Sequence, residues 1–216
     1  MRMLAAAAFA ARRLGASTSS VALGALIPVV VGPWLLQART QSLALPLFVA
    51  VYALLAADSC RRTRWALAAV PLLALWANVH GSASLGAALV FLHGLIGLAR
   101  RERRGLIFAA GAPAALLASP YAIGLPGYYH TMLLGSKLRD YVLEWGPTHL
   151  DSGTAPFFLI ALVSMYLLGR RSSATSWFER LALPLIVALG VLATRNTIWL
   201  GLAAAISLPR LIDGVL

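Results

Sequence analysis

The sequence predicts an all-α protein, a polytopic bundle of about eight transmembrane helices with both termini in the cytoplasm. Hydrophobic residues make up 60% of the 216 residues and charged residues only 12%, and the mean hydropathy is +0.82. A soluble domain is about a quarter charged. Here long apolar stretches alternate with short arginine clusters, which is typical of membrane helices. Backbone groups in lipid must bond within their own segment, so these stretches are expected to be helical.

Eight apolar stretches are the predicted spans. In chain order they cover residues 19–37, 42–58, 65–79, 82–99, 105–119, 155–169, 181–194 and 198–212. Crossing a bilayer takes about 20 residues, so the shorter stretches are expected to borrow flanking residues or to thin the membrane. Residues 1–18, where arginines interrupt an alanine-rich run, are expected to form an interfacial lead-in. Residues 19–216 then form one transmembrane domain.

The basic residues predict the orientation of this bundle. In an alternating eight-span arrangement, one side holds Arg2, Arg12, Arg13, Arg61, Arg62, Arg64, Arg100, Arg101, Arg103, Arg104, Arg170, Arg171, Arg180 and Arg210, and the other holds Arg39, Lys137, Arg139 and Arg195. Basic loops stay in the cytoplasm, so the first set marks the inside. These arginines are interpreted as topology determinants, with contacts to anionic lipid as a secondary role. The net charge of +11 is therefore not taken as a sign of nucleic-acid binding.

The longest outer connection, residues 120–154, holds the candidate catalytic carboxylates. Asp140, Glu144 and Asp151 could each act as a general base or as an oxygen ligand of a divalent metal. A solvated charge pair of Asp140 or Glu144 with Lys137 is the alternative. The single cysteine, Cys60, excludes an internal disulfide framework and carries no metal signature, so no cofactor is assigned with certainty.

Polar and aromatic residues at the outer helix ends are predicted to converge on one outward-facing cavity. The candidate substrate-binding residues are Arg39, Gln41, Trp76, Asn78, His80, Tyr121, Trp145, Arg195 and Asn196. Asn78 and His80 are costly at the end of an apolar helix unless they face a wet or protein-lined space. Arg39 and Arg195 would suit a phosphate, because guanidinium offers a fork of donors.

Each of these assignments has a structural alternative. Trp76, Tyr128, Tyr129 and Trp145 could belong to an aromatic interface belt instead of stacking on a sugar. His80 could bond a neighbouring helix, and the two outer arginines could be interface anchors. His93, in the middle of a predicted span, is expected to be packed and hydrogen-bonded and not to lie on a proton path.

A series of short motifs carries a family resemblance. In order they are Arg39-x-Gln41, Trp76-Ala-Asn-x-His80-Gly81-Ser, Ser119-Pro120-Tyr121-x-x-Gly124, Glu144-Trp145-x-Pro147 and Arg195-Asn196. From about residue 39 onward the chain resembles a group of large bacterial membrane proteins that are similar to the GT-C superfamily of glycosyltransferases. The resemblance implies sugar transfer from a polyprenyl-phosphate donor at the outer face of the bacterial inner membrane.

Two departures from that group affect the expected function. The chain has Arg39-Thr40-Gln41 where the group usually has Arg-Pro-Gln, and its first outer connection, residues 38–41, lacks the acidic residue essential in GT-C enzymes. The group is also longer, so the chain is expected to be an incomplete or catalytically deficient portion that needs an upstream membrane segment or a partner subunit. The alternative function is a non-enzymatic transporter or lipid-carrier subunit, although no inverted repeat is evident.

Overall fold

A computed structural model describes residues 2–32, 40–133 and 142–215, and in these ranges the chain is helical, with no β-strand. The α-helices are α1 (Arg2–Arg13), α2 (Thr18–Val31), α3 (Thr40–Cys60), α4 (Ala69–Val79), α5 (Ala83–Ala99), α6 (Arg104–Leu117), α7 (Leu125–Leu133), α9 (Ala155–Arg170), α10 (Trp177–Leu192) and α11 (Thr197–Asp213). Short 3₁₀ helices connect them: η2 (Arg64–Ala68), η3 (Ala122–Gly124), η4 (Leu143–Trp145), η5 (Ser172–Ala174) and η6 (Thr194–Asn196). The all-α class is therefore confirmed.

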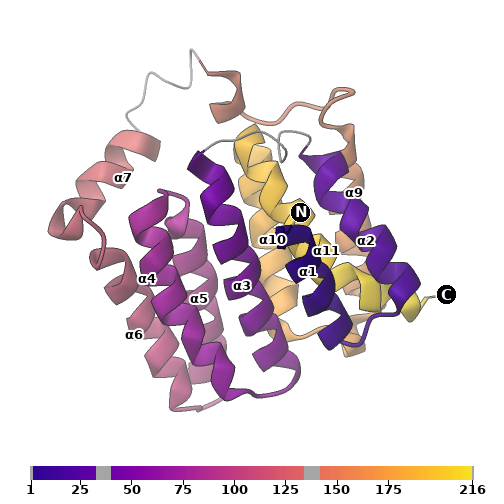
Figure 1. The fold of residues 1–216 in the computed structure, drawn as a ribbon, viewed down its shortest axis with the longest axis horizontal. Coiled ribbons are helices and arrows are strands. Elements are labelled where there is room, and N and C mark those ends of the chain that lie inside the picture. Colours follow the sequence, from indigo (N-terminus) through magenta and orange to yellow (C-terminus); the bar gives the residue numbers. More distant parts are fainter. Residues whose placement is uncertain (1, 33–39, 134–141, 216) are drawn as a thin grey trace.

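The long helices run up and down, and each predicted stretch contains one of them (Figure 1). The stretch predicted at 42–58 is extended at both ends as α3, and the stretch at 65–79 is divided into η2 and α4. Helix α2 ends at Val31, and residues 33–37 of the first predicted span lie outside the described residues. The alternation brings every second connection to the same end of the bundle.

Helix length supports membrane crossing at few places. Among the described helices, α3, with 21 residues, is long and apolar enough to cross a bilayer by itself. Helices α6 and α7 pass the same test only when taken together, and they are bent by 100° at the break between them. Helices α2, α5 and α9 are apolar but shorter. The helical bundle is thus observed, whereas eight crossings of a membrane stay a prediction.

Helix α11 runs through the middle of the bundle and is buried along nearly its whole length, from Thr197 to Leu211. Its Trp199 ring lies 5.1 Å from that of Phe48 and 5.9 Å from that of Trp76, between ring centroids. A helix that is apolar on all sides belongs in an interior. Trp76 is fully buried in this core, which differs from both roles that the sequence left open for it, a place in an aromatic belt and a sugar-stacking surface.

The N-terminal segment packs on the bundle. In α1 the side chains of Ala7 and Ala11 are buried, and the helix contacts α3 and α11. After the turn, Ser17 and Ser20 both donate hydrogen bonds to Asp213 at the end of α11. This arrangement joins the two ends of the described chain and gives the lead-in a packing role.

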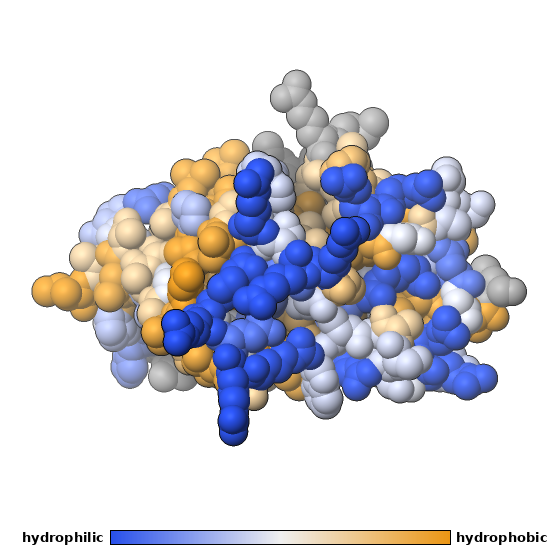
Figure 2. Space-filling view, turned by 90° about the horizontal axis from the view of Figure 1, so that it is seen from below, coloured by the Kyte–Doolittle hydropathy of each residue, from blue (hydrophilic) through white to orange (hydrophobic). Residues whose placement is uncertain are grey.

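The two ends of the bundle differ in charge. One end, named here the arginine end, holds the connections from α3 to α4, from α5 to α6 and from α9 to α10, and hydrophilic side chains gather on it (Figure 2). The opposite end, named the histidine end, is where α4 ends before His80 and α11 begins after η6. The partition of arginine clusters and candidate site residues is therefore present in the fold.

Glycines allow α5 and α6 to touch backbone to backbone. A Cβ atom on Gly105 would lie 2.5 Å from the backbone nitrogen of Leu98 and 2.7 Å from the carbonyl oxygen of Gly94. Backbone atoms cannot move aside as a flexible side chain can, so the two helices would have to separate. The close contact therefore requires glycine at this position.

We expect Gly105→Ala to destabilise the fold by about 1–3 kcal/mol, the usual cost of overpacking. The measurement is thermal unfolding of the purified chain in detergent. Gly169→Ala is the matched control, because Gly169 is also helical and a Cβ there meets nothing within 4 Å. Equal melting temperatures for the two variants would contradict the close packing of α5 on α6.

Candidate functional site

The candidate site lies at the histidine end, where the segment before α9 is tied to the end of α10. The backbone nitrogen of Thr194 donates to Gly146 O at 3.1 Å, and that of Thr148 donates to Val191 O at 2.9 Å. The Thr148 hydroxyl also donates to Gly190 O, at 2.5 Å. The two bonds from Thr148 satisfy carbonyls that the end of α10 leaves open. Together with the Thr194 bond, they also hold Trp145 and Arg195 on adjacent segments.

Arg195 is the centre of this site. Its Cζ atom lies 4.1 Å from the centroid of the Trp145 ring, within the distance for a cation–π contact. The Gln41 amide donates to the carbonyl oxygen of Arg195 at 3.3 Å, so the start of α3 meets η6. Asn196 donates from its side chain to Leu189 O at 3.1 Å and so caps α10. Gln41, Trp145 and Arg195 thus lie together in the fold, and Asn196 holds the end of α10 beside them. Their convergence on an outward-facing cavity stays a prediction.

His80 is held in a defined orientation by Ser82. The backbone nitrogen of Ser82 donates to His80 Nδ1 at 3.0 Å, and the Ser82 hydroxyl lies 2.8 Å from the same atom. Trp76 Nε1 donates to that hydroxyl oxygen at 3.1 Å. Because Nδ1 accepts hydrogen bonds, the proton of the neutral ring is on Nε2. Burial, followed by the positive charge of Arg195, lowers the pKa of His80 below its ordinary 6.5.

Three tyrosines surround the His80–Gly81 turn. Tyr129 Oη donates to Gly81 O at 2.9 Å, and Tyr121 stacks on Tyr128 with ring centroids 4.1 Å apart. A Cβ atom on Gly81 would lie 2.7 Å from Tyr128 Oη, so a larger residue there would displace the Tyr128 side chain. Burial and the neighbouring Tyr121 raise the pKa of Tyr128, and the charge of Arg195 opposes this rise.

Tyr128 and Tyr129 are absent from the predicted site residues. Their place in the long outer connection was the available signal, but sequence spacing does not show that α7 folds back on the His80 turn. The 100° bend between α6 and α7 brings them there.

Other predicted site residues have structural roles. Asn78 donates to Ala74 O at 2.8 Å and to Ala118 O at 3.0 Å, which joins α4 to the end of α6. Asp151 Oδ1 accepts from the backbone nitrogens of Gly153 at 2.8 Å and Thr154 at 3.0 Å, at the start of α9. These backbone bonds lower the pKa of Asp151, so it is a weak base.

The two other candidate carboxylates are Glu144 and Asp140. Glu144 is half-buried on η4, directly before Trp145. Asp140 and Arg39 lie outside the described residues. Among the described residues no group of three His, Cys, Asp or Glu side chains could hold a metal ion. Glu144 is therefore the carboxylate that the described fold places next to the Arg195 contact.

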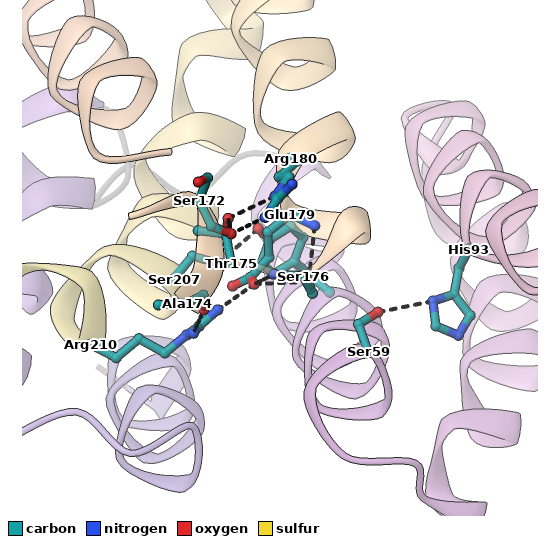
Figure 3. A network of polar contacts seen from close by, with 11 residues as sticks. Ser59, His93, Ser172, Ala174, Thr175, Ser176, Glu179, Arg180, Ser207 and Arg210 are labelled. Atoms are coloured by element: carbon teal, nitrogen blue, oxygen red, sulfur yellow. Dashed lines mark hydrogen bonds and ion pairs between the residues drawn. The ribbon is translucent and has the colours of Figure 1, made fainter. Parts of the chain in front are cut away.

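A second polar cluster lies toward the arginine end (Figure 3). His93 is buried, as expected, and its Nε2 atom lies 3.1 Å from Asp58 Oδ2, while Nδ1 lies 3.3 Å from the Ser59 hydroxyl. Glu179 is fully buried and forms an ion pair with Arg210. Arg210, expected to act only as a topology determinant, thus also fixes α11 to α10.

These residues were missing from the sequence-based site. Asp58, at the end of the apolar stretch 42–58, was the available signal, since a carboxylate there needs a partner, but its partner lies far away in sequence. Glu179 lies before the stretch predicted at 181–194 and gave no such signal. Both carboxylate oxygens of Asp58 have partners, because Oδ1 accepts from the backbone nitrogen of Thr63 at 2.7 Å and Oδ2 lies beside His93. It is best explained as the polar cross-link of a bundle interior.

The comparisons with known proteins gave no match. No family model fits the sequence, and neither a curated protein nor a solved structure is similar to it. The resemblance to GT-C glycosyltransferases therefore rests on the short motifs alone.

We expect His80 to titrate below 6.5 and its pKa to rise toward that value in Arg195→Gln, because the variant removes the nearby positive charge. The folded state binds fewer protons than the unfolded chain between the lowered pKa and 6.5, so stability rises with pH across that window. The measurement is NMR of histidine-labelled protein, with Arg103→Gln at the opposite end as control. An unchanged His80 pKa in Arg195→Gln would show that the two groups do not interact.

Proposed function

We propose that this chain is an integral membrane protein whose eight long helices cross the bilayer. Large apolar side chains on the outward faces of different helices support this proposal: Leu26, Leu75, Phe91 and Leu162 are 60%, 54%, 43% and 68% exposed. They lie near the middle of α2, α4, α5 and α9, between the two polar ends. Such a surface is costly in water and suits lipid.

On this proposal the arginine end faces the cytoplasm and the histidine end faces outward, toward the periplasm of a bacterial cell. Cys60 is exposed at the arginine end, and Ile123 is 94% exposed at the histidine end. The chain thus offers a reporter position at each end.

We expect a membrane-impermeant thiol reagent added to intact cells to label Ile123→Cys, made in a Cys60→Ser background, and to leave Cys60 of the unaltered chain unlabelled. After permeabilisation both should react. Labelling of Cys60 from outside, or equal labelling of the two positions, would contradict the orientation. The double variant carries its own control, since Cys60→Ser alone has no thiol.

For the histidine end we propose binding of the phosphate of a polyprenyl-phosphate sugar, as in GT-C-like glycosyltransferases. The observation that carries the proposal is the Arg195 guanidinium held over Trp145 at 4.1 Å, with its backbone fixed by Gln41. Guanidinium provides paired donors for phosphate oxygens. His80 Nε2–H supplies a further donor on a neutral ring, and the tyrosines of α7 and Trp145 offer faces for a sugar.

The acceptor of the sugar needs a carboxylate base. Asp151 does not suit that role, because its Oδ1 accepts two backbone hydrogen bonds in the turn before α9 and its pKa is lowered. Glu144 is the candidate next to the donor site in the described part of the chain. Asp140, which lies outside the described residues, and an upstream membrane segment or partner subunit are the other sources in this proposal. In this proposal the chain binds and positions the donor. It transfers the sugar without another segment or subunit only if one of its own carboxylates acts as the base.

We expect Arg195→Gln to weaken binding of a labelled polyprenyl-phosphate sugar by about tenfold or more, as loss of a charge-assisted hydrogen bond does. Binding is measured with the purified chain in nanodiscs. Asp151→Asn is the matched control, because an asparagine side chain can accept the same backbone hydrogen bonds in a turn, and we expect it to bind normally. Unchanged binding in Arg195→Gln would falsify the phosphate site. Movement of the unmodified lipid across proteoliposomes, without any transfer product, would instead favour a lipid carrier.

A further inference from the structure

The arginine end carries much more positive charge than its carboxylates neutralise. Its carboxylates are all engaged: Asp58 with His93 and Arg104, Glu102 with Arg62, Glu179 with Arg210, and Asp213 with Ser17 and Ser20. In the described part of the chain, the arginines of this end that form no ion pair are Arg12, Arg13, Arg61, Arg64, Arg100, Arg101, Arg103, Arg170, Arg171 and Arg180. An unneutralised surface of this kind attracts an anionic partner.

Three exposed aromatic rings lie among these arginines, each beneath a guanidinium. Phe9, Trp65 and Trp177 are 66%, 66% and 54% exposed. The Cζ atoms of Arg13, Arg64 and Arg180 lie 5.7, 5.3 and 5.0 Å from the respective ring centroids. The three pairs belong to α1, η2 and α10, so they are distributed around the end of the bundle and not confined to one segment.

The chemistry of these pairs fits a lipid headgroup. A guanidinium stacked on a ring keeps the N–H groups at its edge available for a phosphate. The ring itself is amphipathic or apolar, and aromatic rings favour the headgroup level of a bilayer. The pairs at Phe9 and Trp65 are the more open ones, because Arg180 also donates to Thr175 and Ser172.

Exposed leucines at the arginine end favour a membrane over other anionic partners. Leu67, Leu98 and Leu181 are 37%, 40% and 44% exposed, within a few residues of Arg64, Arg100 and Arg180. Acyl chains next to the headgroups would cover these side chains, whereas a nucleic acid would leave them in water.

We propose that the stacked pairs Arg13–Phe9, Arg64–Trp65 and Arg180–Trp177 form a docking surface for anionic phospholipid headgroups. The inference rests on the proposed membrane location and adds a lipid class to it. Each basic residue near an anionic surface strengthens association by about fivefold. The surface would hold anionic lipid around the arginine end in preference to zwitterionic lipid.

The test uses the full chain in nanodiscs of phosphatidylcholine. A minor share of the lipid carries bromine near the headgroup end of its acyl chains, and this brominated lipid is phosphatidylglycerol in one sample and phosphatidylcholine in the other. Bromine quenches the fluorescence of nearby tryptophans. The difference between the unaltered chain and Trp65→Phe/Trp177→Phe isolates the two rings of interest. We expect the brominated phosphatidylglycerol to quench them more strongly than the brominated phosphatidylcholine.

Arg13→Gln/Arg64→Gln should lower this preference by about fivefold or more. The matched control is Arg100→Gln/Arg103→Gln, which removes the same charge from exposed arginines that lie over no ring in the described part of the chain, and it should lower the preference less than the loss of the stacked arginines does. An equal loss in both variants, or relief of quenching by added duplex DNA, would overturn the proposal. Equal quenching by both lipids would overturn it while leaving the membrane location intact. Absence of quenching by either lipid would remove the membrane location as well.

Discussion

The burial of α11 through the centre of the bundle is the constraint on which the rest of the structure depends. Its apolar surface meets Phe48 of α3 and Trp76 of α4 at the level of Trp199. The same helix begins directly after Arg195 and carries Arg210 near its other end. Any shift of α11 along its axis would therefore move the histidine end and the ion pair with Glu179 together. The core thereby fixes the distance between the two polar ends.

Polar groups inside this apolar bundle are tolerated because nearly all of them are paired. A buried charge without a partner costs several kcal/mol, and a paired one much less. Asp58 forms an ion pair with Arg104 and Glu179 forms one with Arg210, and Tyr52 shares a hydrogen bond with Ser207 at 2.9 Å. Such pairs contribute little net stability. What they supply is alignment, because a rotated helix would leave a charge unpaired in an apolar interior.

The sequence predicted the helices well because their signal is local. Apolar stretches bounded by arginine clusters placed α3, α5 and α11 to within a few residues, and alternation of the loops placed the arginines at one end. Contacts between distant segments were harder to predict. Nothing in the spacing shows that Asn78 bonds Ala118 O or that Trp76 is enclosed by Trp199. The bend after α6 was equally hard to predict, because it involves one residue of unusual backbone conformation, Ala122, with a φ of 40°. This bend places Tyr128 over Gly81.

The difference between local signals and long-range contacts also explains which site residues could be predicted from the sequence. A guanidinium that suits phosphate can be named from its residue type, and Arg195 is found beside Gln41 and Trp145. The role of a carboxylate depends on what its oxygens touch. Asp151 and Glu144 look equivalent in the sequence, yet Asp151 accepts two backbone bonds at the start of α9. A carboxylate that already accepts two backbone hydrogen bonds is stabilised as an anion and gains little by accepting a proton.

The lengths of the helices connect the two ends in the proposed membrane. At 1.5 Å per residue, the 16-residue α10 and the 17-residue α5 are about 24 Å and 26 Å long, against a hydrocarbon core of about 30 Å. If arginines and aromatic rings hold one end at the cytoplasmic headgroups, the histidine end lies below the opposite headgroups unless the bilayer thins. Arg195 and His80 would then act in a medium of low dielectric constant, where a cation attracts phosphate more strongly than at the membrane surface. The short helices that argue against simple membrane crossing thus suit a site that draws a lipid phosphate inward.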